Sequence, residues 1–195
     1  MTHSLRSTVS IRFAELASVR HVVGRMRAAD LQEACYARGI APEDFDAEGY
    51  SHALVASAAI LRIAHAPACA AYPDGEPVAL IGAGPHPFSR EDRIIGMLAT
   101  DRWPAVAQAL TRWCVVEFPR ALVSIGTAVA RCFVWEGHRQ ALAWVQRMRP
   151  EPDGARITPA GHVFRAFAWR VPPLTLVSRA DRATLRSRAE LQGVA

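Results

Sequence analysis

Apolar residues recur along the chain with two different periods, and the period changes near the middle. Residues 9–13 alternate with a period of two, which predicts a first strand. Residues 17–38 carry apolar side chains at helical spacing, and we expect Ser18 to cap this helix and Gly39 to end it. Residues 42–66 continue helically. The first third of the chain is therefore predicted as one strand followed by two helices.

Beyond Pro67 strands and helices alternate. The pattern predicts, in chain order, a hairpin over 68–83 that turns at 73–75, a loop over 85–92, a strand over 93–100, a helix over 104–118, a strand over 121–130, a helix over 139–148 and a final strand over 161–171. No internal repeat and no linker divides this order. We therefore expect one α/β domain over residues 1–172, followed by an Arg-rich tail over 173–195.

The composition narrows the possible chemistry. The chain has 195 residues, 51% of them hydrophobic, which is enough for a sizeable core. All 23 basic residues are Arg, so neither a Lys Schiff base nor a P-loop Lys can be present. The net charge of +5 and the pI of 9.6 are compatible with nucleic acid or another acidic partner. Most Arg residues are scattered, however, and they form no basic patch in the sequence.

The cysteines and the N-terminus favour a reducing compartment. Cys35, Cys69, Cys114 and Cys132 include no closely spaced pair of the kind that binds zinc. The N-terminal residues lack the apolar region of a signal peptide, and no run of 18 apolar residues could span a membrane. We expect the thiols to be reduced and buried, with Cys114 and Cys132 acting as small core residues rather than nucleophiles.

The segment "LATDRWPAVAQAL" runs from the strand at 93–100 into the helix at 104–118. The order of elements around it resembles the GNAT acyltransferases, which have a mixed, largely antiparallel sheet flanked by helices. In that family this helix receives the pyrophosphate of acetyl-CoA, behind a loop rich in glycine. Here the loop has no glycine, Trp103 adds bulk and Pro104 removes an amide proton. If acetyl-CoA binds, the resemblance assigns it to Thr100, Arg102 and Ala105.

A second segment, "EGHRQALAWVQRMRP", also departs from the family pattern. His138 stands where the family has Asn, and Trp144 stands at an aromatic position that is often a Tyr. In many family members this Tyr protonates the departing thiolate. An indole N–H cannot act as an acid near neutral pH. We therefore expect Trp144 to be structural rather than catalytic.

Four segments give a closer resemblance: "VGRMRAADLQEACYARGI", "DGEPVALIGAG", "IGMLATD" and "ALAWVQRM". They are similar to GNAT-like proteins of tailed bacteriophages, related to the internal virion protein A of T7-like podoviruses. The resemblance covers roughly residues 9–171. It implies a virion or assembly protein, located in the virion or the host cytoplasm, that packs against other phage proteins or with copies of itself during head assembly or DNA ejection.

Three functions remain open from the sequence. The first is a non-enzymatic phage virion or assembly protein that needs no cofactor and does not bind acetyl-CoA. The alternative is an active acetyl-CoA-dependent N-acyltransferase with an atypical phosphate loop. The third is a DNA-contacting virion component that uses scattered Arg residues and the basic tail. The fold alone cannot choose among them.

Other candidate residues have simpler interpretations. The acidic residues Glu43, Asp44, Asp46 and Glu48 could bind an amine substrate, but we expect a solvated helix N-terminus. The seven His residues form no metal-binding motif. Trp135 is the best candidate for an exposed aromatic side chain at a partner surface.

Overall fold

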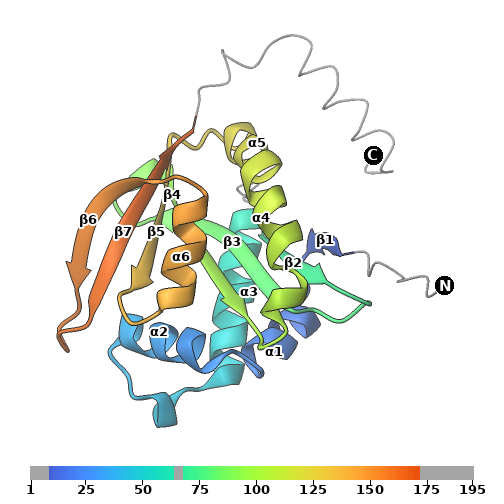
Figure 1. The fold of residues 1–195 in the computed structure, drawn as a ribbon, viewed down its shortest axis with the longest axis vertical. Helices are drawn as coiled ribbons and strands as arrows, with labels where there is room; N and C mark the ends of the chain where they lie inside the picture. Colours follow the sequence, from blue (N-terminus) through green and yellow to red (C-terminus); the bar gives the residue numbers. More distant parts are fainter. Residues whose placement is uncertain (1–8, 64–67, 172–195) are drawn as a thin grey trace.

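A seven-stranded sheet forms the centre of the computed structural model, which describes residues 9–63 and 68–171 (Figure 1). Its strands in chain order are β1 (Ser10–Phe13), β2 (Ala68–Tyr72), β3 (Ala79–His86), β4 (Ser89–Ala99), β5 (Val129–Trp135), β6 (Glu151–Ile157) and β7 (Val163–Arg170). In space they are ordered β1-β2-β3-β4-β5-β7-β6. Neighbouring strands are antiparallel except for β4 and β5, which are parallel.

The parallel pair is short. Strands β4 and β5 pair only between Asp92–Ile94 and Val129–Arg131. Beyond these residues β4 continues to Ala99 and β5 to Trp135, and the two described strands make no further pairs. We call the opening between their C-terminal halves the splay. It interrupts the sheet and leaves room for side chains from both of its faces to meet.

Within the described ranges, six α-helices flank the sheet: α1 (Leu16–Val23), α2 (Ala28–Arg38), α3 (Ala47–Ile63), α4 (Ala107–Val116), α5 (Phe118–Ser124) and α6 (Arg139–Arg147). Helices α4, α5 and α6 cover one face, α1 and α3 cover the opposite face, and α2 lies near the C-terminal end of β5 (Figure 1). The expected α/β domain, with a mixed and largely antiparallel sheet flanked by helices, is confirmed. No helix in the described residues has the length and apolarity to cross a membrane.

Successive side chains of β3 pack into different layers of the core, one on each face of the sheet. Leu80 packs with Val22 and Val23 of α1, whereas its neighbour Ile81 packs with Leu110 of α4. Successive side chains of a strand point to opposite faces, so a continuous apolar run such as that of β3 is buried on both sides.

The single helix predicted over residues 17–38 is wrong, because two helices occupy this segment. Between them the chain pairs with the end of β4: Met26 forms a bridge with Thr100, and the amide of Arg27 donates to the Ala99 carbonyl at 2.9 Å. Ser18 lies inside α1 and caps nothing. Gly39 does end α2, as predicted, with a left-handed φ of 68°.

Three further boundaries differ from the prediction. The strand expected over 121–130 falls on the end of α5, a connecting segment and the start of β5, and the loop expected over 85–92 belongs mostly to the β3–β4 hairpin. The helix expected over 104–118 is preceded by a 3-10 turn at Trp103–Ala105 and begins only at Ala107. Strand β6 was not predicted because every residue in it is exposed, as a sheet edge permits. The predicted tail lies outside the described residues.

Candidate active site at the splayed strands

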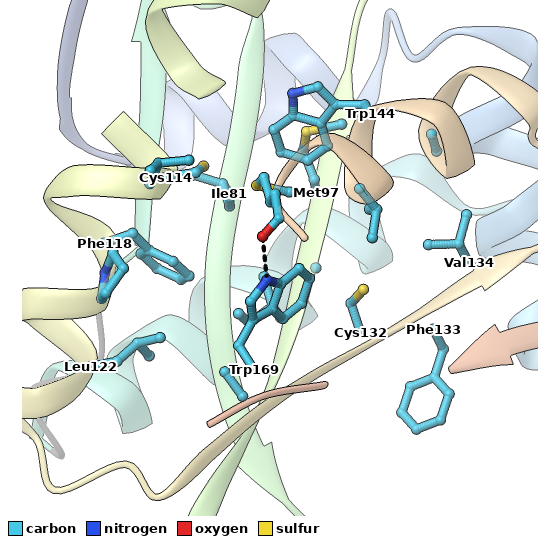
Figure 2. A pocket seen from close by; sticks show the side chains of 18 of the residues that line it. Ile81, Met97, Cys114, Phe118, Leu122, Cys132, Phe133, Val134, Trp144 and Trp169 are labelled. Atoms are coloured by element: carbon cyan, nitrogen blue, oxygen red, sulfur yellow. Dashed lines mark hydrogen bonds between the residues drawn. The ribbon is translucent and has the colours of Figure 1, made fainter. Parts of the chain in front are cut away.

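An apolar cavity of about 230 Å³ opens on the sheet face that α4, α5 and α6 cover. Its walls come from strands β3, β4, β5 and β7 and from these three helices, with two further residues from α2; Figure 2 shows Ile81, Met97, Cys114, Phe118, Cys132 and Trp144 around it. The Trp169 indole N–H donates to the Met148 carbonyl at 3.1 Å, which fixes this ring in the wall. The cavity therefore suits an apolar group with few polar partners.

A second cavity of about 260 Å³ lies on the α2 side of the sheet. Five residues line both cavities: Asp30, Glu33, Ile95, Met97 and Phe133. Three of them belong to the strands that form the splay, and the two acids come from α2. The two cavities therefore adjoin at the splay, where a group that enters from one face of the sheet can meet a group that enters from the other.

Glu33 is the titratable group at this junction. The backbone N–H of Trp135 donates to Glu33 Oε2 at 3.2 Å, and no side chain in the described residues forms an ion pair with it. Burial raises the pKa of its carboxyl from 4.5 to about 7, and Asp30 adds to the rise, while His138, the Trp135 amide and Arg27 oppose it. A carboxylate with a pKa near 7 can accept a proton at physiological pH.

Asp30, one helical turn before Glu33, is engaged in a buried polar network instead. Arg27 binds it through two nitrogens, with Nη2 at 3.0 Å from Oδ1. The Nε2 atom of His138 lies 3.2 Å from the same oxygen. Arg27 also donates from Nη1 to Gln140 Oε1 at 2.8 Å. Because its oxygens are occupied by two partners, Asp30 is less available as a base than Glu33.

His138 connects this network to helix α6. It is buried and caps the helix: its Nδ1 accepts from the Ala141 amide at 3.4 Å. If Nδ1 accepts, the neutral ring carries its proton on Nε2, which then donates to Asp30. His138 thus caps the helix at the position where the family pattern has Asn, and it also joins α6 to α2.

The three residues assigned to a cofactor lie together after β4 but have different surroundings. Thr100 is buried, and its Oγ1 accepts from the Arg102 amide at 3.3 Å. The Arg102 guanidinium pairs with Glu76 and lies 4.0 Å from Asp74. Ala105 is exposed in the 3-10 turn. Binding of acetyl-CoA by these residues remains a prediction.

The turn itself leaves few amides for a phosphate. The amides that donate within it are those of Arg102, Trp103, Ala105 and Val106. Pro104 has no amide proton. The donors available to an anion are therefore the first amides of α4, which have no partner within their own helix. This site differs from a glycine loop, whose backbone closes around phosphate oxygens.

Trp144 joins α6 to α4 and to the turn. Its side chain is buried, its indole N–H donates to Thr111 Oγ1 at 2.7 Å, and its ring meets the Trp103 ring edge-on at a centroid distance of 5.3 Å. The structural environment expected for Trp144 is therefore present. The ring also forms part of the wall of the first cavity.

We expect Trp144→Ala to lower the free energy of unfolding by about 3–5 kcal/mol, because a large buried ring and its hydrogen bond are lost. Urea denaturation followed by circular dichroism measures this change. Trp113→Ala is the control, since Trp113 is only partly buried in the same region and should cost less. A loss below about 1 kcal/mol for Trp144→Ala would mean that the helices pack without this ring.

Three other predictions have clear outcomes. Trp135 is not an exposed aromatic: it is partly buried, and its ring meets Tyr36 edge-on at 4.9 Å. Cys114 and Cys132 are buried, as expected, and burial raises the pKa of each thiol to about 12, so both stay protonated. Among the acids expected at a helix start, Asp46 caps α3 by accepting from the amides of Glu48 and Gly49.

Comparison with solved structures identifies the fold. A GNAT-superfamily phosphinothricin acetyltransferase from Sinorhizobium meliloti, in complex with acetyl-CoA, matches with a TM-score of 0.64 and 12% identity over 86% of this chain and 91% of its own. A putative acetyltransferase from Salmonella typhimurium, with its cofactor acetyl-CoA, gives 0.62 and 12% over 85% and 95%. The chain has the GNAT fold. A GNAT-family acetyltransferase from Streptococcus pneumoniae gives 0.61 and 11% over 85% and 100%.

The sequence comparisons add no nearer relative. No family model matches the chain, and no curated protein matches it. At 10–13% identity the structural matches establish the GNAT fold but not an activity. They give no indication of a phage origin, so the closer resemblance to phage proteins remains a prediction.

Sequence reasoning missed Glu33. The signal that was available is its spacing: Asp30 and Glu33 share a helix face with Ala34 and Ala37, and all four residues line the second cavity. Small residues on a helix face indicate close packing, so an acid next to them is a candidate for burial. The splay that receives this face depends on strand pairing, which the spacing alone does not indicate.

Proposed function

We propose that this chain is an acetyl-CoA-dependent N-acyltransferase in which Glu33 is the general base. The observation that carries the proposal is the position of Glu33. It lies where the two cavities adjoin, with a pKa of about 7 and no side-chain partner in the described residues. The fold supports the proposal, because two of the similar structures hold acetyl-CoA.

Some parts of the chain fit acetyl-CoA better than others. The first cavity is apolar and reaches the splay, which suits the thioester end, and the N-terminus of α4 suits a phosphate. The turn before α4 contributes fewer free amides, and Arg102 would have to leave Glu76 to contact an anion. We therefore expect binding weaker than a glycine loop provides, with Thr100, Arg102 and Ala105 at the diphosphate end.

The chain's own residues take part in the proposed reaction through one proton transfer. When bound, acetyl-CoA would supply the thioester: the acceptor nitrogen would bond to its acyl carbon as the carbon–sulfur bond breaks, and CoA would leave as a thiolate that takes a proton from solvent. Glu33 accepts the proton that the amine nitrogen loses, and the Trp135 amide holds its Oε2 in place. The apolar walls formed by Ile95, Met97 and Phe133 limit water at the junction, which favours aminolysis over hydrolysis.

A second candidate is the non-enzymatic virion or assembly protein suggested by the sequence. The observations that favour it are the glycine-free turn, whose amides are largely used internally, and the packing of Trp103 against Trp144 beside the first cavity. In this case the chain would keep the GNAT fold for packing against partners. The candidate predicts that acetyl-CoA does not bind measurably.

Calorimetric titration with acetyl-CoA separates the two candidates. The acyltransferase proposal expects saturable binding with a Kd in the micromolar range and a loss of at least about tenfold in Cys132→Phe, because the larger side chain fills the first cavity. Ser124→Phe, which adds a ring at an exposed position on α5, is the control. Circular dichroism verifies that both variants fold. No saturable heat from the parent protein at millimolar ligand would reject the acyltransferase and favour the second candidate.

A further inference from the structure

We propose that the acceptor amine also carries an anionic group, a carboxylate or a phosphate, held by Arg38 and Arg156 at the mouth of the second cavity. This inference rests on the proposed function and names the class of substrate for its second cavity. The cavity has acids at the splay and two arginines elsewhere in its lining: Asp30 and Glu33 also line the first cavity, whereas Arg38 and Arg156 line only the second.

Arg38 is held in place from two sides. Its guanidinium carbon lies 4.0 Å from the centroid of the Tyr50 ring, and its Nη1 donates to the Ala34 carbonyl at 3.1 Å. It is exposed, five residues after Glu33 on α2, which corresponds to about 7.5 Å along the helix. An arginine in this position retains donors for a planar anion.

Arg156 lines the same cavity from another element, the edge strand β6. Other arginines of the neighbouring strands have acidic partners: Arg165 pairs with Glu136, and Arg170 pairs with Glu151. Within residues 9–63 and 68–171, no carboxylate lies within ion-pair distance of Arg38 or Arg156. Two arginines without acidic partners that line one cavity form a cationic mouth, which favours an anionic group.

Apart from these acids and arginines, most of the lining is apolar. Leu98 and Phe133 come from the splayed strands, and Phe164 comes from β7. A ligand that spans the cavity would therefore place its nitrogen at Glu33, an apolar stem against these side chains and an anion at the arginines. A small ω-amino acid, or an aminoalkylphosphonate of similar length, has this arrangement of charges.

The test is a matched series of acceptors. ω-Amino acids from 3-aminopropanoate to 6-aminohexanoate are compared with aminoalkylphosphonates and with uncharged amines of equal length, and transfer is followed by release of the CoA thiol. At the best length we expect an anionic acceptor to exceed the uncharged amine about tenfold or more in kcat/KM, the factor that one charge-assisted contact of about 1.4 kcal/mol provides. Arg38→Gln with Arg156→Gln should abolish this preference and leave transfer to uncharged amines nearly unchanged. Arg147→Gln, at an exposed position outside both cavities, is the control.

Each result has a distinct meaning. A preference for anionic acceptors that persists in the double variant would overturn the assignment of the arginines. Equal rates with charged and uncharged amines would overturn the inference and leave the acyltransferase standing. Acetyl-CoA binding without transfer to any member of the series would overturn the substrate class. Absence of both binding and transfer would overturn the proposed function, and this inference with it.

Discussion

We expect Glu33→Gln to lower acyl transfer by about 100- to 10,000-fold and to leave acetyl-CoA binding nearly unchanged, because the variant loses the proton acceptor but keeps the shape of the side chain. Transfer is measured as kcat/KM for the best amine of the series, and binding is measured by calorimetry. Glu91→Gln, an exposed position at the start of β4, is the matched control. Full activity in Glu33→Gln would exclude this residue as the base.

The pH dependence gives an independent test of the same residue. Because burial raises the pKa of Glu33 to about 7, the parent activity should rise with pH through 7 and then level off. NMR titration of the glutamate side-chain carboxyl carbons should contain one resonance with a midpoint near 7 that disappears in Glu33→Gln. This measurement needs no acceptor, so it tests the ionisation even if the natural amine is unknown. A midpoint near 4.5 would contradict the site.

As pH rises through 7, the free energy of unfolding should fall while acyl transfer rises. The folded pKa of Glu33 exceeds its ordinary value of 4.5, so its contribution to stability is fully present below pH 4.5 and is lost as pH rises through about 7. A rise from 4.5 to about 7 corresponds to about 3 kcal/mol. Glu33→Gln does not ionise, so we expect it to be more stable than the parent at pH 8 by up to this amount, and to show no such gain below pH 4.5. Such a trade-off is typical of a functional group kept in an unfavourable environment.

Much of the fold could be predicted from local pattern. The helix at residues 139–148 and the end of α2 at Gly39 match the structure closely, because a regular apolar stripe and a left-handed glycine are both local features. The errors have non-local causes. The break between α1 and α2 depends on pairing of Met26 with Thr100, and β6 is held by backbone bonds to β7 with no buried side chain. Neither contact leaves a periodic signal.

The site was less predictable than the fold for the same reason. The resemblance directed attention to Thr100, Arg102 and the turn, which can be found from sequence order alone. The base and the arginines of the second cavity lie on α2 and β6, more than 100 residues apart in the chain. Only the splay of β4 and β5 and the position of α2 beside it bring Glu33, Arg38 and Arg156 to one cavity. Residues gathered in this way cannot be found by spacing.

The second large effect concerns stability: we expect Asp30→Ala to lower the free energy of unfolding by about 3–5 kcal/mol. Asp30 and Arg27 are both buried, and removal of the carboxylate leaves the guanidinium as an uncompensated buried charge. Urea denaturation at pH 7 measures the change as a shift in midpoint at constant slope. Glu136→Ala, which breaks the exposed pair with Arg165, is the control and should cost less than about 1 kcal/mol.

A double variant separates the buried charge from the hydrogen-bond network. Arg27→Met with Asp30→Leu removes both charges, so it should recover much of the loss if the unpaired guanidinium is the cause. The recovery should be incomplete, because Gln140 and His138 each lose a polar partner. A double variant as unstable as Asp30→Ala would locate the cost in the network that joins α2 to α6 rather than in the charge. An Asp30→Ala variant that costs less than about 1 kcal/mol would contradict both explanations.

Since Asp30 also raises the pKa of Glu33, the milder Asp30→Asn should move the midpoint of the Glu33 titration to lower pH.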